Sequence, residues 1–128
     1  MSFLNKLFGE SQKAEEVSKV NWISLETREQ LDDVVKQSFE KPVLIFKHST
    51  RCSISRMVLK QFENDFTFED NITPYFLDLL EHRNISNEIA SRFGVQHQSP
   101  QVIVIKEGVA VYNTSHESID ATDLKKFV

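Results

Sequence analysis

The chain has 128 residues, 40% of them hydrophobic, and carries a formal net charge of −4 at pH 7. This length fits one domain with a hydrophobic core and leaves no room for a second. The acidic balance and the lack of a Lys/Arg cluster argue against a nucleic-acid partner. No apolar stretch approaches the roughly 20 residues that span a bilayer.

The cysteine content and the N-terminal residues indicate a compartment. Cys52 is the only cysteine, which excludes an intramolecular disulfide. The first residues lack the long apolar core of a signal peptide. We therefore expect a cytoplasmic protein.

The first 19 residues differ in pattern from the rest. Phe3, Leu4, Leu7 and Phe8 can share a helical face, but Gly9 would end so short a helix. A two-turn helix is marginal in water, and membrane-surface helices are usually longer and richer in basic residues. We expect a mobile or loosely docked arm over residues 1–19 and one domain over residues 20–128.

The first elements of this domain alternate between strand and helix. A short strand is expected at Trp22–Leu25, and Thr27 with Gln30 forms a capping box that opens a helix ending before Pro42. The inward stripe of that helix is predicted as Leu31, Val34, Val35 and Phe39. The apolar run Val43–Phe46 suits a strand buried on both faces.

After this strand the hydrophobic period changes to that of a helix. The residues that recur at three- and four-residue spacings are Ile54, Met57, Val58, Phe62 and Phe66. This spacing places Cys52 at the start of the helix. A further strand follows at Ile72–Leu79, in which Pro74 needs a position at the start or without a ladder partner.

The last third of the sequence predicts a helix, a hairpin and a final helix. The first helix is capped by Asn84 or Ser86, buries Ile89, Ala90 and Phe93, and stops at Gly94. The hairpin has strands at Gln101–Lys106 and Val109–Tyr112 around the turn Glu107–Gly108. The final helix spans Asp120–Phe127.

This order of elements predicts an α/β fold. Strands that alternate with helices favour parallel pairing, and the terminal hairpin adds antiparallel strands at one edge. The result is a mixed sheet between two layers of helices. In such sheets the reactive site forms beyond the C-terminal end of a central strand, where Ser49–Cys52 is expected.

The position of Cys52 at a helix start favours its thiolate. Unpaired N–H groups, including that of Ser53, and the positive end of the helix dipole point at a group placed there. Arg51 adds positive charge, and the hydroxyl of Ser55 can turn back by one helical turn to donate a hydrogen bond to the sulfur. The alternative is an inert buried cysteine, but the polar flanking residues favour a reactive thiol at the surface.

Two further polar residues near this turn have less distinct roles. His48 and Cys52 alone do not make a metal site, and His82, His97 and His116 show no ligand spacing with them. We therefore expect no metal. Asp78 is either a buried proton relay below the cysteine or a strand-end carboxylate that faces water.

These motifs resemble a known family. The residues that carry the resemblance are Val43–Thr50, the C-x-x-S motif Cys52-Ser53-Ile54-Ser55 and the later Ser99-Pro100-Gln101-Val102. From about residue 20 onward the layout resembles thioredoxin-like proteins, and the motifs resemble the YtxJ-like monothiol bacilliredoxins of low-GC Gram-positive bacteria. Those proteins typically read Thr-Cys-Pro-Ile-Ser; here Arg51 lies between Thr50 and Cys52, and Ser53 replaces the proline. The resemblance implies a thioredoxin-like fold with a central mixed β-sheet flanked by helices on both faces.

The resemblance also implies a function. Cys52 would remove bacillithiol, a cysteine-containing sugar thiol that serves as co-substrate, from bacillithiolated client proteins. Bacillithiol or an external reductase would then regenerate the thiol, since Ser55 stands where two-cysteine relatives have a resolving thiol. The resemblance further implies that Ser99, Pro100 and Thr50 contact the substrate, with a cis peptide before Pro100.

Two other functions remain open at this point. A one-cysteine thiol peroxidase would need Pro-x-x-x-Thr-x-x-Cys, whereas Ile45 and Ser49 stand at the proline and threonine positions. A non-catalytic module that binds extended peptides at Ser99–Pro100 would leave the cysteine incidental.

Overall fold

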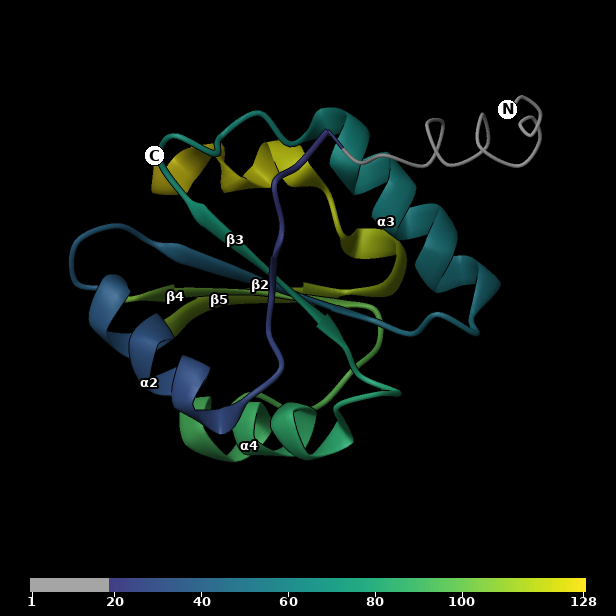
Figure 1. Ribbon diagram of the computed structural model, residues 1–128. Coiled ribbons are helices and arrows are strands. Elements are labelled where there is room, and N and C mark those ends of the chain that lie inside the picture. Colours follow the sequence, from purple (N-terminus) through teal and green to yellow (C-terminus); the bar gives the residue numbers. More distant parts are fainter. Residues whose placement is uncertain (1–18) are drawn as a thin grey trace, which may run out of the picture.

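A computed structural model describes residues 19–128 of the chain. Its centre is a five-stranded sheet with the strand order β1-β3-β2-β4-β5 (Figure 1). Strands β1, β3 and β2 run parallel, and β4 and β5 are antiparallel to their neighbours. The strands are β1 (Ile23–Ser24), β2 (Val43–His48), β3 (Thr73–Asp78), β4 (Gln101–Lys106) and β5 (Val109–Ser115). The predicted mixed sheet is confirmed.

Helices cover both faces of this sheet (Figure 1). On one face lie α2 and α4; on the other lie α3 and the C-terminal 3-10 helix η2. Their bounds are α2 (Arg28–Gln37), α3 (Ser53–Asp65), α4 (Arg83–Phe93), η1 (His116–Ser118) and η2 (Ala121–Phe127). Each face therefore has a hydrophobic core of its own.

The central strand β2 serves both cores. Ile45 packs in the core under α2 and α4, while Leu44 and Phe46 pack in the core under α3. All six residues of β2 are buried because both of its faces are covered. The burial of both faces explains the apolar run Val43–Phe46. The strand extends two residues further, to the polar pair Lys47 and His48.

Several local features that the sequence predicts are present in the structure. Thr27 and Gln30 make the capping box of α2. Gly94 ends α4 in the left-handed conformation, with a φ of 64°. The β4–β5 turn has positive φ angles at Glu107 and Gly108. Pro74 lies within β3 at a position where β1 offers no partner, since β1 pairs only with Tyr75 and Phe76.

Other expectations are corrected. Helix α4 begins at Arg83 with His82 as its cap residue, so neither of the predicted caps, Asn84 or Ser86, has that position. The C-terminal segment is a 3-10 helix rather than an α-helix, and Asp120 is its cap residue. Phe39 is exposed because it follows the end of α2.

The inward face of α3 also differs from the prediction. Ile54 and Met57 are 42% and 65% exposed, whereas Ser55 is fully buried. The buried positions are Ser55, Phe62 and Phe66, with spacings of seven and four residues. Polar groups at the end of β2 occupy the space under the first turn of α3, so a serine rather than Ile54 points inward there.

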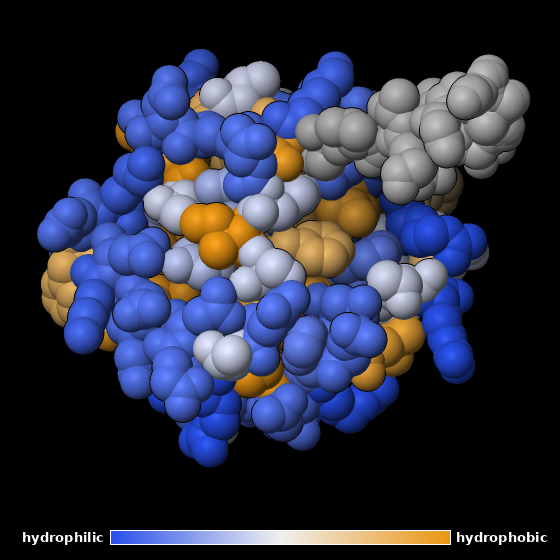
Figure 2. All heavy atoms as spheres, in the orientation of Figure 1, coloured by the Kyte–Doolittle hydropathy of each residue, from blue (hydrophilic) through white to orange (hydrophobic). Residues whose placement is uncertain are grey.

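Hydrophilic side chains cover most of the face in Figure 2, and apolar atoms show between them in small groups. Over residues 19–128 no helix is long and apolar enough to cross a membrane. The predicted arm at residues 1–19 lies, apart from Lys19, outside the described residues, and the domain boundary stays a prediction.

Candidate active site

Cys52 is the N-terminal cap residue of α3, as predicted. Its backbone is extended, its N–H donates to the Ser49 carbonyl at 3.2 Å, and its own carbonyl accepts the Arg56 N–H at 3.0 Å. The side chain is half-buried, and within residues 19–128 no hydrogen bond reaches the sulfur. A partly accessible thiol thus stands at the start of the first helical turn, where the backbone N–H groups have no intrahelical partner.

The two arginines near Cys52 have different positions. The Arg56 guanidinium donates to the Thr50 carbonyl at 3.1 Å and so ties the β2–α3 turn to the helix. Arg51 is exposed. With Thr50, Leu80 and Glu81, among others, it lines a depression of about 620 Å³ between the β2–α3 turn and the loop after β3. This depression is open to solvent beside the cysteine turn.

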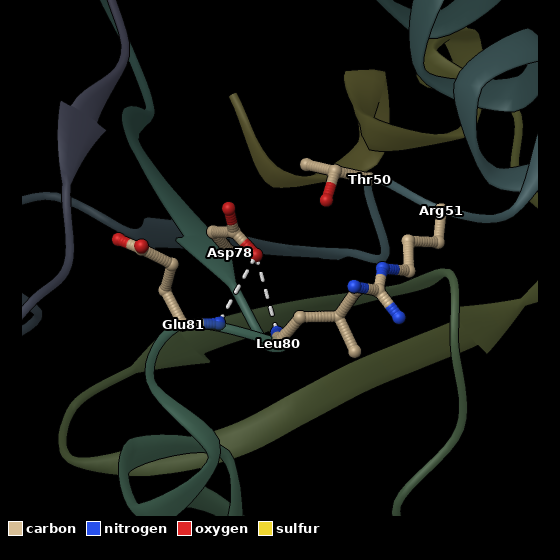
Figure 3. A pocket seen from close by; sticks show the side chains of 5 residues that line it. All are labelled: Thr50, Arg51, Asp78, Leu80 and Glu81. Carbon is tan, nitrogen blue, oxygen red and sulfur yellow. Dashed lines mark hydrogen bonds between the residues drawn. The ribbon is translucent and has the colours of Figure 1, made fainter.

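Asp78 also lines that depression (Figure 3). One of its carboxylate oxygens accepts the N–H groups of Leu80 at 3.1 Å and Glu81 at 3.3 Å. Asp78 also pairs in register with His48 on β2. It is a strand-end carboxylate that fixes the next turn and lies close to His48.

Ser55 and His48 form a buried polar pair beneath the first turn of α3. The Ser55 hydroxyl lies 2.8 Å from Nδ1 of His48 and accepts the Ser49 N–H at 3.1 Å. His48 is only 4% exposed and lies against the Phe76 ring. The hydroxyl predicted to reach the sulfur is therefore bound to His48 and Ser49 instead. Ser53, by contrast, is an exposed residue in the first position of the helix.

The charges around His48 act in both directions. Burial lowers the pKa of His48, Asp78 and Glu63 raise it, and Arg56 lowers it, with a net lowering. A neutral imidazole is favoured at neutral pH as a result.

The peptide bond between Ser99 and Pro100 is cis, as the resemblance implied. Since Gln101 pairs with Lys47, the two residues lie beside the end of β2 from which the cysteine turn emerges. The Gln101 side chain fixes this loop by donating to the Gln96 carbonyl at 3.0 Å. The Ser99 hydroxyl is the one buried side-chain polar atom in residues 19–128 that lacks a hydrogen-bond partner.

On the other face of β2, Lys47 contacts His97. Its ammonium lies 2.8 Å from Nδ1 of His97, which is also 3.2 Å from the Ser86 hydroxyl. Lys47 is fully buried, and this burial lowers its pKa to about 8. The pKa of His97 is lowered by burial and by the charges of Lys47 and Arg83. This cluster connects β2 and α4 to the loop before Pro100.

No group of three potential metal ligands occurs in residues 19–128. His48 is bound to Ser55 and His97 to Lys47, so both imidazoles have partners within the protein. The residues around the cysteine turn thus include one thiol and, under the same helical turn, the buried pair of Ser55 and His48.

Comparison with known families agrees with this geometry. Residues 23–124 match the family model of the monothiol bacilliredoxin BrxC. The chain belongs to the monothiol bacilliredoxin family. This bacilliredoxin is accordingly a thiol–disulfide oxidoreductase with a thioredoxin fold and one cysteine.

Solved structures support the same fold. One, described as an oxidoreductase with a thioredoxin fold, is 32% identical with a TM-score of 0.70 over 81% of this bacilliredoxin and 90% of that chain. A thioredoxin of Malassezia sympodialis is 20% identical, with a TM-score of 0.66 over 86% and 90% of the two chains. Mitochondrial thioredoxin 3 of Saccharomyces cerevisiae is 16% identical, with a TM-score of 0.64 over 82% and 91%. The last two show the fold alone.

Sequence reasoning missed the roles of three site residues in this bacilliredoxin: Lys47, His48 and His97. The available signal was the pair Lys47-His48 directly after four apolar residues, at the end of a strand where sites form. Nothing local in the sequence indicates that His97 reaches Lys47, fifty residues away.

Proposed function

We propose that this bacilliredoxin removes bacillithiol from client proteins through Cys52. The Cys52 thiolate attacks the bacillithiol sulfur of the client mixed disulfide. The bond between Cys52 and bacillithiol forms as the old disulfide breaks, and the client cysteine leaves as a thiolate. No net electron is gained or lost in this exchange.

The second half of the cycle restores the thiol. A bacillithiol thiolate attacks the mixed disulfide on Cys52, which yields oxidised bacillithiol and the free Cys52 thiolate; an external reductase would achieve the same result. An external thiol is needed because Cys52 is the only cysteine and Ser55 cannot form a disulfide.

The observation that carries this proposal is the placement of Cys52. It is partly accessible, caps α3 and has no competing hydrogen bond to its sulfur among residues 19–128. The first-turn N–H groups, including that of Ser53, and the Arg51 charge favour the thiolate. The match to the bacilliredoxin family favours bacillithiol as the thiol that is exchanged.

The substrate would lie along the end of β2. Ser99 has an unpartnered buried hydroxyl beside cis-Pro100, which a substrate group can satisfy. Thr50 lines the open depression beside Cys52 and is available for the rest of the substrate. A lone reactive thiol also suits the cytoplasm, where thiols are kept reduced, and we propose that the protein works there on bacillithiolated proteins.

Intact-mass analysis after mixing with oxidised bacillithiol tests the proposal. We expect one bacillithiol adduct on the wild type that reduced thiol removes, and none on Cys52→Ser. The variant should keep the wild-type circular dichroism, because serine preserves the size of the side chain.

A bacillithiolated client protein provides the functional measurement. Cys52→Ser should abolish release of bacillithiol from the client, since a serine hydroxyl is not ionised at neutral pH. Full release by the variant would disprove the role of Cys52, and a wild type without an adduct would favour the non-catalytic peptide-binding function.

A further inference from the structure

The Ser55 hydroxyl has one proton and two hydrogen-bonding neighbours. It is fully buried, so water does not compete for it. The Ser49 N–H, at 3.1 Å, can only donate to the serine oxygen. His48 Nδ1, at 2.8 Å, can accept the serine proton or donate its own.

The proton on His48 therefore decides where the Ser55 proton points. With a bare Nδ1, Ser55 donates to His48 and has nothing left for the sulfur. With a protonated Nδ1, His48 and Ser49 both donate to the serine oxygen. The Ser55 proton is then free to turn toward Cys52, the cap residue three positions earlier in the chain.

We propose that His48 is the base that accepts the Cys52 proton, with Ser55 as the carrier between them. The thiol proton passes to the Ser55 oxygen, and the Ser55 proton passes to Nδ1 of His48. The products are a Cys52 thiolate, a Ser55 hydroxyl that donates to it and an imidazolium. This assignment deepens the proposed function, since it rests on Cys52 as the nucleophile.

The surroundings of His48 suit both states. Burial and Arg56 on α3 lower the pKa of His48, which leaves it neutral and able to accept a proton while Cys52 is a thiol. Asp78 on β3 and Glu63 on α3 favour the imidazolium once it forms. Glu63 is held by the Trp22 indole N–H at 2.7 Å, and Asp78 by two backbone N–H groups. Both carboxylates are fixed in advance.

Coupling of this kind acts in both directions. If the thiolate holds a proton on His48, then blocking the sulfur must release it. His48 should therefore titrate at a lower pH in a protein whose sulfur is capped by a neutral group than in the free protein.

Nuclear magnetic resonance of the histidine ring nitrogens measures this difference. We compare the free protein with the protein treated with methyl methanethiosulfonate, which leaves a neutral methyl disulfide on Cys52. The His48 midpoint should move to lower pH on capping, and His82 should not move. Identical His48 curves would overturn the proposal.

Two variants separate the relay from the thiol itself. In Ser55→Ala and in His48→Phe, iodoacetamide alkylation of Cys52 at pH 7 should slow about tenfold. This is the loss of reactive thiolate that a rise of one unit in the pKa of the thiol produces. His82→Asn is the matched control, because it removes a histidine that contacts neither Ser55 nor His48, and should alkylate like the wild type. Wild-type alkylation in both relay variants would overturn the proposal.

Neither measurement uses bacillithiol. A shifted His48 titration without a bacillithiol adduct would keep the relay and refute the proposed substrate. An adduct without the shift would keep the substrate and refute the relay.

Discussion

Lys47 and His48 are neighbours at the end of the same strand and face opposite layers of the protein. Both are buried, at 0% and 4% exposure. His48 faces α3, has a hydroxyl partner and lies near two carboxylates. Lys47 faces α4, and within residues 19–128 its ammonium hydrogen-bonds to the imidazole of His97 and forms no ion pair with a carboxylate.

The two sides of β2 therefore differ in their energetics. Around His48 the polar groups satisfy one another, so removing one leaves others unpaired. Around Lys47 no carboxylate compensates the buried charge: burial lowers its pKa from 10.5 to about 8, a shift equivalent to about 3 kcal/mol of lost stability at neutral pH. Burial of Lys47 therefore costs stability at neutral pH. What its ammonium does is contact His97 in the loop before cis-Pro100.

The largest expected gain in stability comes from removing that charge. Lys47→Met keeps a long side chain in the core and should raise the free energy of unfolding by about 2 kcal/mol at pH 7, after loss of the bond to His97. Urea denaturation measures this difference. A destabilised variant would show that the cluster of Lys47, His97 and Ser86 contributes more than the buried charge costs.

The pH dependence of stability sharpens the same point. Because Lys47 has its pKa lowered in the folded state, the unfolded chain binds more protons between about pH 8 and 10.5. The stability conferred by a neutral Lys47 is thus absent below pH 8 and gained as the pH rises through this window. The free energy of unfolding of the wild type should approach that of Lys47→Met between pH 8 and 10.5. A difference that stays constant with pH would show that Lys47 is not buried in its charged form.

On the other side of the strand, removing a polar side chain should lower the free energy of unfolding instead of raising it. Ser55→Ala removes the partner of both the Ser49 N–H and His48, and should lower the free energy of unfolding by about 1–3 kcal/mol. Ser86→Ala is the matched control, since Ser86 is an equally buried serine with one such contact, to His97 at 3.2 Å. It should lose less than Ser55→Ala in the same denaturation series. Equal losses would mean that the two sides do not differ.

Most of the fold follows from local sequence signals. The capping box at Thr27, the stop at Gly94 and the apolar run from Val43 each act over a few residues, and each formed as predicted. The errors occur where tertiary packing decides: Ile54 lies on a helical stripe in the sequence but points outward, because the space below it is filled by His48 and Ser55.

Only the local features of the candidate site were predictable from the sequence. A lone cysteine after a strand and before a helix is visible there, and so is Ser99-Pro100. The partners of Ser55 and Lys47 are not, since they depend on the alternation of side chains along β2 and on contacts with residues far away in the chain. The predicted bond from Ser55 to the sulfur neglected the competing imidazole.

The smallest expected effect is that of Ser53→Pro, at the position where the family typically has proline. Ser53 is the first residue of α3, and its N–H has no intrahelical partner to lose. Cys52 before it already has a φ of −100° and a ψ of 121°, which lie in the region that a residue preceding proline prefers. Since Ser53 is exposed and forms no side-chain hydrogen bond with either polar cluster, neither side of β2 should respond.

For Ser53→Pro we expect the free energy of unfolding to stay within about 0.5 kcal/mol of the wild type and bacillithiol release to persist at a similar rate. Proline takes one N–H from the thiolate but stiffens the turn, so these effects on the rate oppose each other. Lost helical circular dichroism would show that Ser53 does not occupy the first turn and that Cys52 is not its cap.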